Sequence, residues 1–235
     1  MQQQYFLARH AFVCSIGADV IVLDLKQDRY LWFERSFWEP IARLIGRGSS
    51  ASGSQFPAED APDETALAQL LESGLITEDS SQGKAVAPPA IALPSASLME
   101  DFRARRPAIR PGHVIVFLRG IVTALLRLRW RPLEKIVGDV GRERQRHGQA
   151  ADLEQLRDLT EIFRRLRPMV FTAHDHCLFE SLTLIHFLAH YRIHPHWVFG
   201  VQASPFIAHC WLQQGEVACN DILDRIRRCT PIMLA

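Results

Sequence analysis

The sequence has few cysteines and no long apolar run. Its five cysteines are an odd number, and no two show the C-x-x-C spacing, so neither a disulfide framework nor a zinc knuckle is indicated. The longest apolar stretch, residues 114–128, is interrupted by Arg119 and Arg127 and is shorter than the roughly 20 apolar residues that cross a bilayer. We therefore expect reduced thiols and no membrane span.

A strong charge excess and a targeting segment are also missing. Lys and Arg together number 27 and Asp and Glu 26, for a net charge of +1, which argues against nucleic acid as a partner. The opening residues MQQQYFLARHAF lack the basic start and apolar stretch of a secretion signal. We expect a cytoplasmic protein.

No phosphate-binding loop, dinucleotide-binding turn or EF-hand is present, and we expect no cofactor. The nearest approach to a metal site is the HDHC cluster, in which His174, His176 and Cys177 would act together with His209. A second closely spaced ligand pair is missing from this set. We therefore expect no bound metal, and His174 and His176 would instead line a cleft.

The distribution of charge and of proline divides the chain into two parts. Residues 1–95 hold 7 basic and 12 acidic side chains, whereas residues 96–235 hold 20 and 14, so their net charges are −5 and +6. Between them lies the Pro- and Ala-rich sequence SSQGKAVAPPAIALPSAS, a composition typical of linkers. We predict a domain at 1–80, a linker at 81–96 and a second domain at 97–235.

The N-terminal part combines strand and helix patterns. Strands are expected at Ala11–Ile16, Val20–Leu25 and Tyr30–Phe33, and helices from Ser36 to Ile45 and from Asp63 to Ser73. In the predicted strands, apolar residues alternate with polar ones or follow one another, and polar turns separate the strands. The helices show apolar residues at helical spacing before a glycine.

The C-terminal part reads as helices followed by strands. Apolar periodicity predicts helices at 97–106, 113–129, 152–166 and 177–191, with an exposed polar segment at 138–152. Strand-like segments follow at 196–201, 206–213 and 216–220. This order of elements predicts an α+β fold.

Three residues of the C-terminal part form a candidate catalytic set. Cys177 begins the predicted helix 177–191, and the helix dipole favours a thiolate there. His209 lies in the middle of a predicted strand, on the face opposite to its neighbour Cys210. A base close to a cysteine is what nucleophilic catalysis requires, although such residues are more often buried core members.

The third member depends on the turn at Gln214-Gly215-Glu216. A three-residue loop centred on Gly215 places His209 opposite Asp221, whereas a two-residue turn pairs His209 with Asn220. Either side chain can fix the orientation and tautomer of the imidazole. From the residues alone, both pairings remain open.

The region 174–221 resembles the C-terminal core of lasso-peptide maturation B proteins, which are transglutaminase-like cysteine peptidases that remove the leader from a precursor peptide. The shared motifs are CLFESL, VFGV, PFIAHCW and ND. They match Cys177, His209 and Asp221 to the family's catalytic residues. One departure is Cys210, where the family more often has alanine.

The N-terminal part resembles the peptide-recognition element of pyrroloquinoline-quinone chaperones, a small winged-helix fold of three strands and three helices. The segments DVIVLDLKQDRYLWFERSFWEPIARLI and ALAQLLESGLIT carry the likeness. It implies that the leader adds a strand to a sheet edge, either Val20–Leu25 or Tyr30–Phe33. The implied contact residues are Val20, Val22, Tyr30 and Trp32.

Together the two resemblances imply a leader peptidase of lasso-peptide biosynthesis. Cys177 would attack the carbonyl, His209 would transfer the proton and Asp221 would orient His209. The implied partners are the precursor leader and an ATP-dependent macrolactam synthetase. The alternatives are a non-catalytic leader-binding protein that delivers the precursor, and an acyl transferase of the transglutaminase type.

Overall fold

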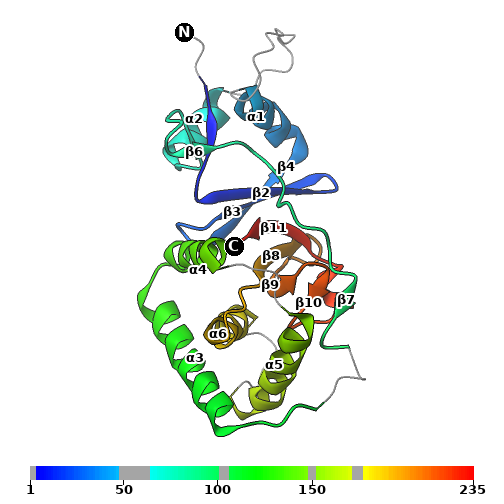
Figure 1. Ribbon diagram of the computed structural model, residues 1–235. Helices are drawn as coiled ribbons and strands as arrows, with labels where there is room; N and C mark the ends of the chain where they lie inside the picture. The colour runs from blue at the N-terminus through cyan, green and yellow to red at the C-terminus, as the bar shows by residue number, and fades with distance from the viewer. Residues whose placement is uncertain (1–3, 48–63, 101–105, 148–151, 171–176) are drawn as a thin grey trace. The chain divides into compact units, whose positions relative to one another are not determined.

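The computed structural model describes residues 4–47, 64–100, 106–147, 152–170 and 177–235 (Figure 1). The chain divides into two compact units, Met1–Pro89 and Ala90–Ala235. This division falls within the segment 81–96 that the sequence analysis interprets as a linker. Helices and strands occur together, and the α+β fold class is confirmed.

The first unit contains two small sheets and two helices in its described residues. In one sheet, β1 (Phe6–Ala8) pairs with β5 (Ile76–Thr77) and with β6 (Gly83–Lys84). The other is an antiparallel meander of β2 (Ala11–Ile16), β3 (Asp19–Asp24) and β4 (Arg29–Glu34). The helices are α1 (Arg35–Arg47) and α2 (Glu64–Glu72). The chaperone resemblance implies three strands and three helices, whereas the described part of this unit has two helices. The resemblance therefore stays a prediction.

The middle strand of the meander corrects one expectation. Because β3 pairs with both β2 and β4, the prediction that Val20–Leu25 forms an exposed edge is wrong. Val20 and Val22 are buried and pack in the core of this unit, together with Trp38 of α1. Within the described residues, β4 has a neighbour on one side only.

The helices of the second unit follow the predicted periodicity in three cases. The described helices of this unit are α3 (Pro111–Trp130), α4 (Leu133–His147), α5 (Leu153–Leu166), the short 3-10 helix η2 (Arg167–Met169), α6 (Cys177–His190) and α7 (Leu223–Ile226). The predictions at 113–129, 152–166 and 177–191 are confirmed.

Two other helix predictions for this unit differ from the structure. Residues 138–147, which are most of the segment 138–152 expected to be polar and exposed, lie in α4, whose Val137 and Val140 are buried. The helix expected at 97–106 begins where a short strand, β7 (Ala96–Ser97), is found. Its residues 101–105 lie outside the described residues.

A five-stranded sheet completes the second unit, with the strand order β11-β8-β9-β10-β7. Its central strands are β8 (His196–Gln202) and β9 (Ile207–Gln214), flanked by β10 (Val217–Ala218) and β11 (Thr230–Leu234). Strand β11 was not predicted from the sequence. Strand β7 comes from the Pro- and Ala-rich segment and pairs in parallel with β10.

Close packing against α6 and within the sheet depends on two glycines. A Cβ atom on Gly120 of α3 would lie 3.2 Å from the carbonyl oxygen of Thr183 in α6, and one on Gly200 of β8 would lie 2.8 Å from the indole of Trp211. Because these two residues lack a side chain, α3 can lie close to α6, and the indole of Trp211 can pack against β8.

Candidate functional site

Cys177 is the first residue of α6 and is half-buried. The orientation of this helix places the thiol where unpaired backbone N–H groups and the positive end of the helix dipole favour an anion. The other cysteines, Cys14, Cys210, Cys219 and Cys229, are buried. Burial raises the pKa of all four thiols, to about 12 for Cys14 and Cys219 and to about 11 for Cys229, which leaves Cys177 as the candidate thiolate.

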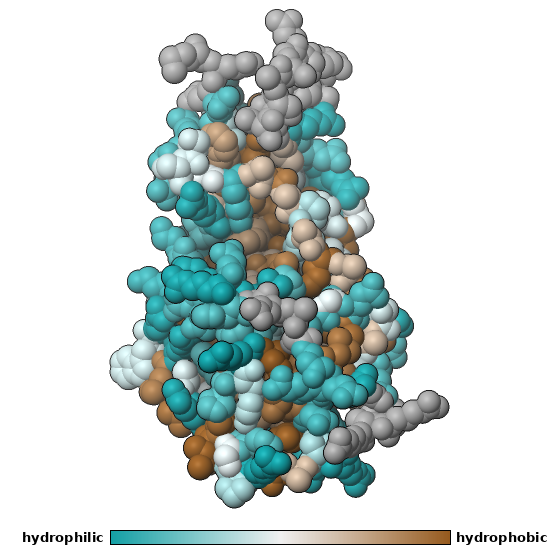
Figure 2. Space-filling view, viewed as in Figure 1, coloured by the Kyte–Doolittle hydropathy of each residue, from teal (hydrophilic) through white to brown (hydrophobic). Residues whose placement is uncertain are grey.

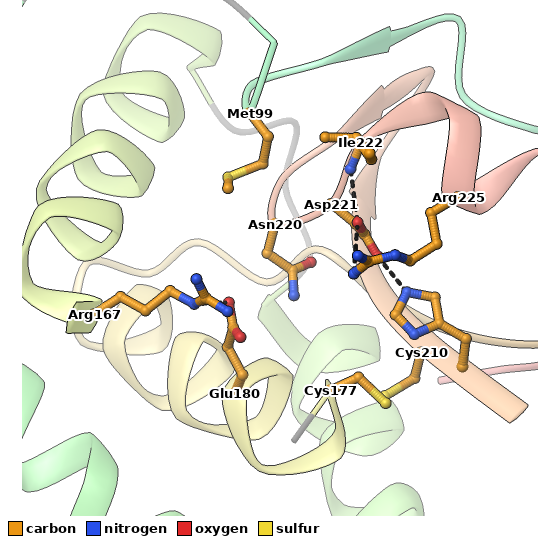
Figure 3. Close-up of a pocket in the computed structure, with 10 residues that line it drawn as sticks. Met99, Arg167, Cys177, Glu180, Cys210, Asn220, Asp221, Ile222 and Arg225 are labelled. Carbon is orange, nitrogen blue, oxygen red and sulfur yellow. Dashed lines mark hydrogen bonds and ion pairs between the residues drawn. The ribbon is translucent and has the colours of Figure 1, made fainter. Parts of the chain in front are cut away.

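His209 and Asp221 lie next to Cys177. The Nε2 atom of His209 forms a hydrogen-bonded ion pair with Oδ2 of Asp221, drawn as a dashed line in Figure 3. Both side chains are buried. Cys177 lines the same pocket as His209 and Asp221, and its interaction with His209 lowers the pKa of the thiol. With Nε2 directed to the carboxylate, Nδ1 is the imidazole nitrogen left to exchange a proton with the thiol.

The pairing of the hairpin differs from both predicted registers. Gln214 pairs with Val217 and Gln213 with Ala218, so the turn consists of Gly215 and Glu216, and Gly215 has a φ of +58°. Strand β10 ends at Ala218. Asp221 therefore reaches His209 from the loop beyond the strand and not as its cross-strand partner.

Asn220, the other predicted orienter, has a different place. Its Oδ1 atom accepts a hydrogen bond from the backbone N–H of Leu212 at 2.8 Å, and its Nδ2 atom donates to Oγ of Ser181 at 3.3 Å. The amide thus ties the loop to β9 and α6. The imidazole is bonded to the carboxylate of Asp221 instead.

Asp221 is held by groups that the sequence analysis did not identify. Its Oδ1 atom accepts from the backbone N–H of Ile222 at 2.8 Å and lies 3.4 Å from Nη1 of Arg225 in α7. Its backbone carbonyl accepts a hydrogen bond from Oγ of Ser97 in β7 at 2.6 Å. Because Ser97 is 124 positions distant in sequence, no local pattern could have revealed this contact.

The electrostatic environment favours an ion pair between the thiol and the imidazole. A hydrogen bond from the Cys210 thiol, opposed by burial and assisted by His209, lowers the pKa of Cys177 to about 4. Burial lowers the pKa of His209, but its bonds to Asp221 and Cys177 outweigh this effect and raise it to about 9. Between these values a thiolate faces an imidazolium, the reactive form of a cysteine nucleophile.

A pocket with a volume of about 210 Å³ adjoins these residues. An ion pair crosses its wall, with Nε of Arg167 2.8 Å from Oε1 of Glu180, which lies one helical turn after Cys177 (Figure 3). Burial raises the pKa of Glu180, and Arg167 opposes this effect. The lining residues are Met99, Arg167, Cys177, Glu180, His209, Cys210, Asn220, Asp221, Ile222 and Arg225.

The predicted leader-contact residues fall into two groups. Val20 and Val22 belong to the core of the first unit, so their side chains are not available to a ligand. Trp32 on β4 is 45% exposed, and its Nε1 atom donates a hydrogen bond to Asp19 at 2.9 Å. Tyr30 lies on the same strand and is partly buried.

A metal-binding cluster of three or more His, Cys, Asp or Glu side chains does not occur among the residues that the structure describes. His174 and His176 of the rival metal site lie outside that part of the chain.

A comparison with family models matches residues 120–234 to the Transglutaminase-like superfamily. The search of curated proteins and the search of solved structures found no match. The matched region runs from α3 to β11 and includes Cys177, His209 and Asp221. It indicates a cysteine-peptidase-like or acyltransferase-like activity. The C-terminal part of this chain therefore contains a transglutaminase-like domain.

Proposed function

We propose that the protein is a leader peptidase of lasso-peptide biosynthesis, which binds the leader of a precursor peptide and cuts it from the core peptide. The observation that carries the peptidase chemistry is that Cys177, His209 and Asp221 line one pocket, in which His209 is bonded to Asp221. The substrate is inferred from the sequence resemblance described above. The proposed location is the cytoplasm.

The chemistry follows from the order of these contacts. The Cys177 thiolate attacks the carbonyl carbon at the junction of leader and core, and the imidazolium of His209 protonates the departing amine. Water then adds to the acyl-enzyme, with His209 as the base, and releases the leader as a free acid. Asp221 holds His209 in the required orientation throughout.

A backbone N–H at the start of α6 is suited to stabilise the oxyanion. Cys177 opens this helix, and its N–H is among those that lack a partner within the helix. Such donors act on the charge that develops in the transition state. The Arg167 and Glu180 pair lines the same pocket and would contact the substrate near the scissile bond.

The leader is proposed to pair with β4 of the first unit. This strand has one neighbour within the described residues, and an unpaired strand edge can accept an added strand. Phe33 of β4 stacks on Phe37 of α1 with ring centroids 5.4 Å apart. The apolar side chains between strand and helix would receive alternate side chains of the leader.

Mass spectrometry of a leader–core peptide incubated with the full chain tests the proposal. Hydrolysis yields two free fragments, whereas acyl transfer to an added amine yields a conjugate. A protein that only delivers the precursor yields neither product but still binds the peptide. Cys177→Ala is the inactive control, and Cys219→Ala, a buried thiol outside the pocket, is the matched active one.

The freed core peptide is proposed to pass to an ATP-dependent macrolactam synthetase. The amine released by cleavage is the group that ring closure requires. Adding that enzyme with ATP to the assay should convert the core peptide into a product lighter by one water. If this product forms equally well with Cys177→Ala, leader removal by this protein is not needed for ring closure, and the proposal is wrong.

A further inference from the structure

Helix α3 presents an apolar face to solvent. Trp130 is 74% exposed and Ile115 66%, values unusual for large apolar side chains grouped together. Figure 2 shows hydrophobic surface along the lower left edge, where α3 lies in Figure 1. The exposed apolar residues of the helix are Ile115, Leu118, Val122, Leu125, Leu126 and Trp130, and we call them the α3 face.

The helix and its ends carry positive charge only. From Arg110 to Arg131 the sequence contains five arginines and no Asp or Glu. Arg119 and Arg129 are exposed on α3, and the guanidinium of Arg129 lies 5.4 Å from the ring centroid of Trp130. An apolar stripe with basic side chains and a terminal tryptophan is typical of helices that lie in a membrane interface.

The opposite side of α3 is an integral part of the fold. Phe117, Gly120 and Ala124 are buried, and Phe117 packs against Phe163 of α5 with ring centroids 5.3 Å apart. By length and composition α3 is long and apolar enough to cross a membrane. A spanning helix would have to leave α5 and α6, and the domain would lose this packing.

We propose that the α3 face binds the surface of a membrane that contains anionic lipids, with α3 parallel to the membrane plane. A 20-residue helix offers a stripe about 30 Å long. Its apolar side chains enter the boundary of headgroups and acyl chains, and its arginines bind lipid phosphates. A second copy fits this face less well, because the two sets of arginines would repel each other.

Cosedimentation of the purified full chain with lipid vesicles tests this surface. One set contains phosphatidylcholine alone and the other about one third phosphatidylglycerol. We expect binding to the anionic vesicles, at least about fivefold weaker binding to the neutral ones, and loss of binding as salt is raised. Neutral and anionic vesicles that bind the chain equally would overturn the role of the arginines.

Two double variants separate the apolar and the basic contributions. Leu118→Ser with Val122→Ser should weaken binding to anionic vesicles at least about fivefold, and Arg119→Gln with Arg129→Gln should remove the preference for anionic lipid. Leu93→Ser, which removes an exposed apolar side chain elsewhere in the second unit, is the matched control and should bind as the unchanged protein does. Circular dichroism confirms that each variant is folded.

Three results would overturn the proposal. The unchanged protein stays in the supernatant with both kinds of vesicle, or the Leu118 and Val122 variant binds as well as the unchanged protein. In the third result, light scattering shows that the unchanged protein forms a dimer or a complex with another protein, that the Leu118 and Val122 variant does not form it, and that neither kind of vesicle binds the chain. None of these results depends on the peptidase reaction, which is measured separately.

Discussion

The two units of the chain differ in the kind of side chain that they bury. In the described part of the first unit the buried polar side chain is Asp24. The second unit buries Ser97, Thr160, Glu161, Glu180, Ser181, Thr183, His209, Gln213 and Asp221. A buried polar group destabilises the fold unless it is hydrogen-bonded, and several of these residues lie in or next to the Cys177 pocket.

The two units therefore offer two kinds of binding site, one made of hydrogen-bonded polar side chains and one made of a strand edge. In the second unit, bonds such as those of Asp221 to His209 and to the Ile222 N–H hold the reactive groups in place. In the first unit an apolar core supports a sheet, and the part suited to binding is an unpaired strand edge. Loss of one buried polar group should therefore affect turnover, whereas changes on β4 should affect affinity alone.

The largest expected effect is that of Cys177→Ala. Leader removal should fall by at least about 1,000-fold, because no other group can form the acyl-enzyme. Binding of a leader peptide, measured by fluorescence anisotropy, should stay within about threefold of the unchanged protein, since it is assigned to the other unit. Iodoacetamide should label Cys177 before the four buried cysteines; preferential labelling of another cysteine would contradict the assignment.

Asp221→Ala should lower kcat by about 10- to 100-fold, because the imidazole loses the group that orients it. The effect should be smaller than that of His209→Ala. Asp224→Ala is the matched control, as this carboxylate lies on the exposed side of α7, and it should retain normal turnover. Equal losses in both variants would indicate a general destabilisation of the loop.

The β4 edge should behave differently from the core behind it. Trp32→Ala removes an exposed side chain and should weaken leader binding by about five- to tenfold with little change in the unfolding midpoint. Val20→Ala should instead reduce stability by about 1–3 kcal/mol with little change in affinity. Urea unfolding and fluorescence anisotropy separate the two outcomes. A Trp32 variant that binds the leader normally would exclude the Trp32 side of β4 as a leader-binding surface.

The smallest expected effect concerns Cys210 and pH. With pKa values of about 4 for Cys177 and about 9 for His209, kcat/KM should fall below the first and above the second. Cys210→Ala removes a donor to the thiolate, so the pKa of Cys177 should rise and the acid limb should move to higher pH. Alkylation at pH 5 should slow by about two- to fivefold. An unchanged acid limb would show that Cys210 does not influence the nucleophile.

Local patterns in the sequence were enough to predict several helices and strands. Apolar periodicity identified α3, α5 and α6, and short runs of apolar residues between polar turns identified β2, β3 and β4. The position of Cys177 at a helix start and of His209 within a strand followed from the same periods. These features depend on neighbours a few residues away, which a single sequence contains.

The contacts between distant segments could not be predicted in this way. The central position of β3 and the hydrogen bond from Ser97 to Asp221 join segments that no local pattern connects. The expected three-residue loop selected Asp221 with the wrong register, because the turn consists of Gly215 and Glu216 and Gln214 pairs with Val217. Strand order and loop paths result from packing over the whole unit, and the free energy of that packing cannot be assigned to a single stretch of sequence.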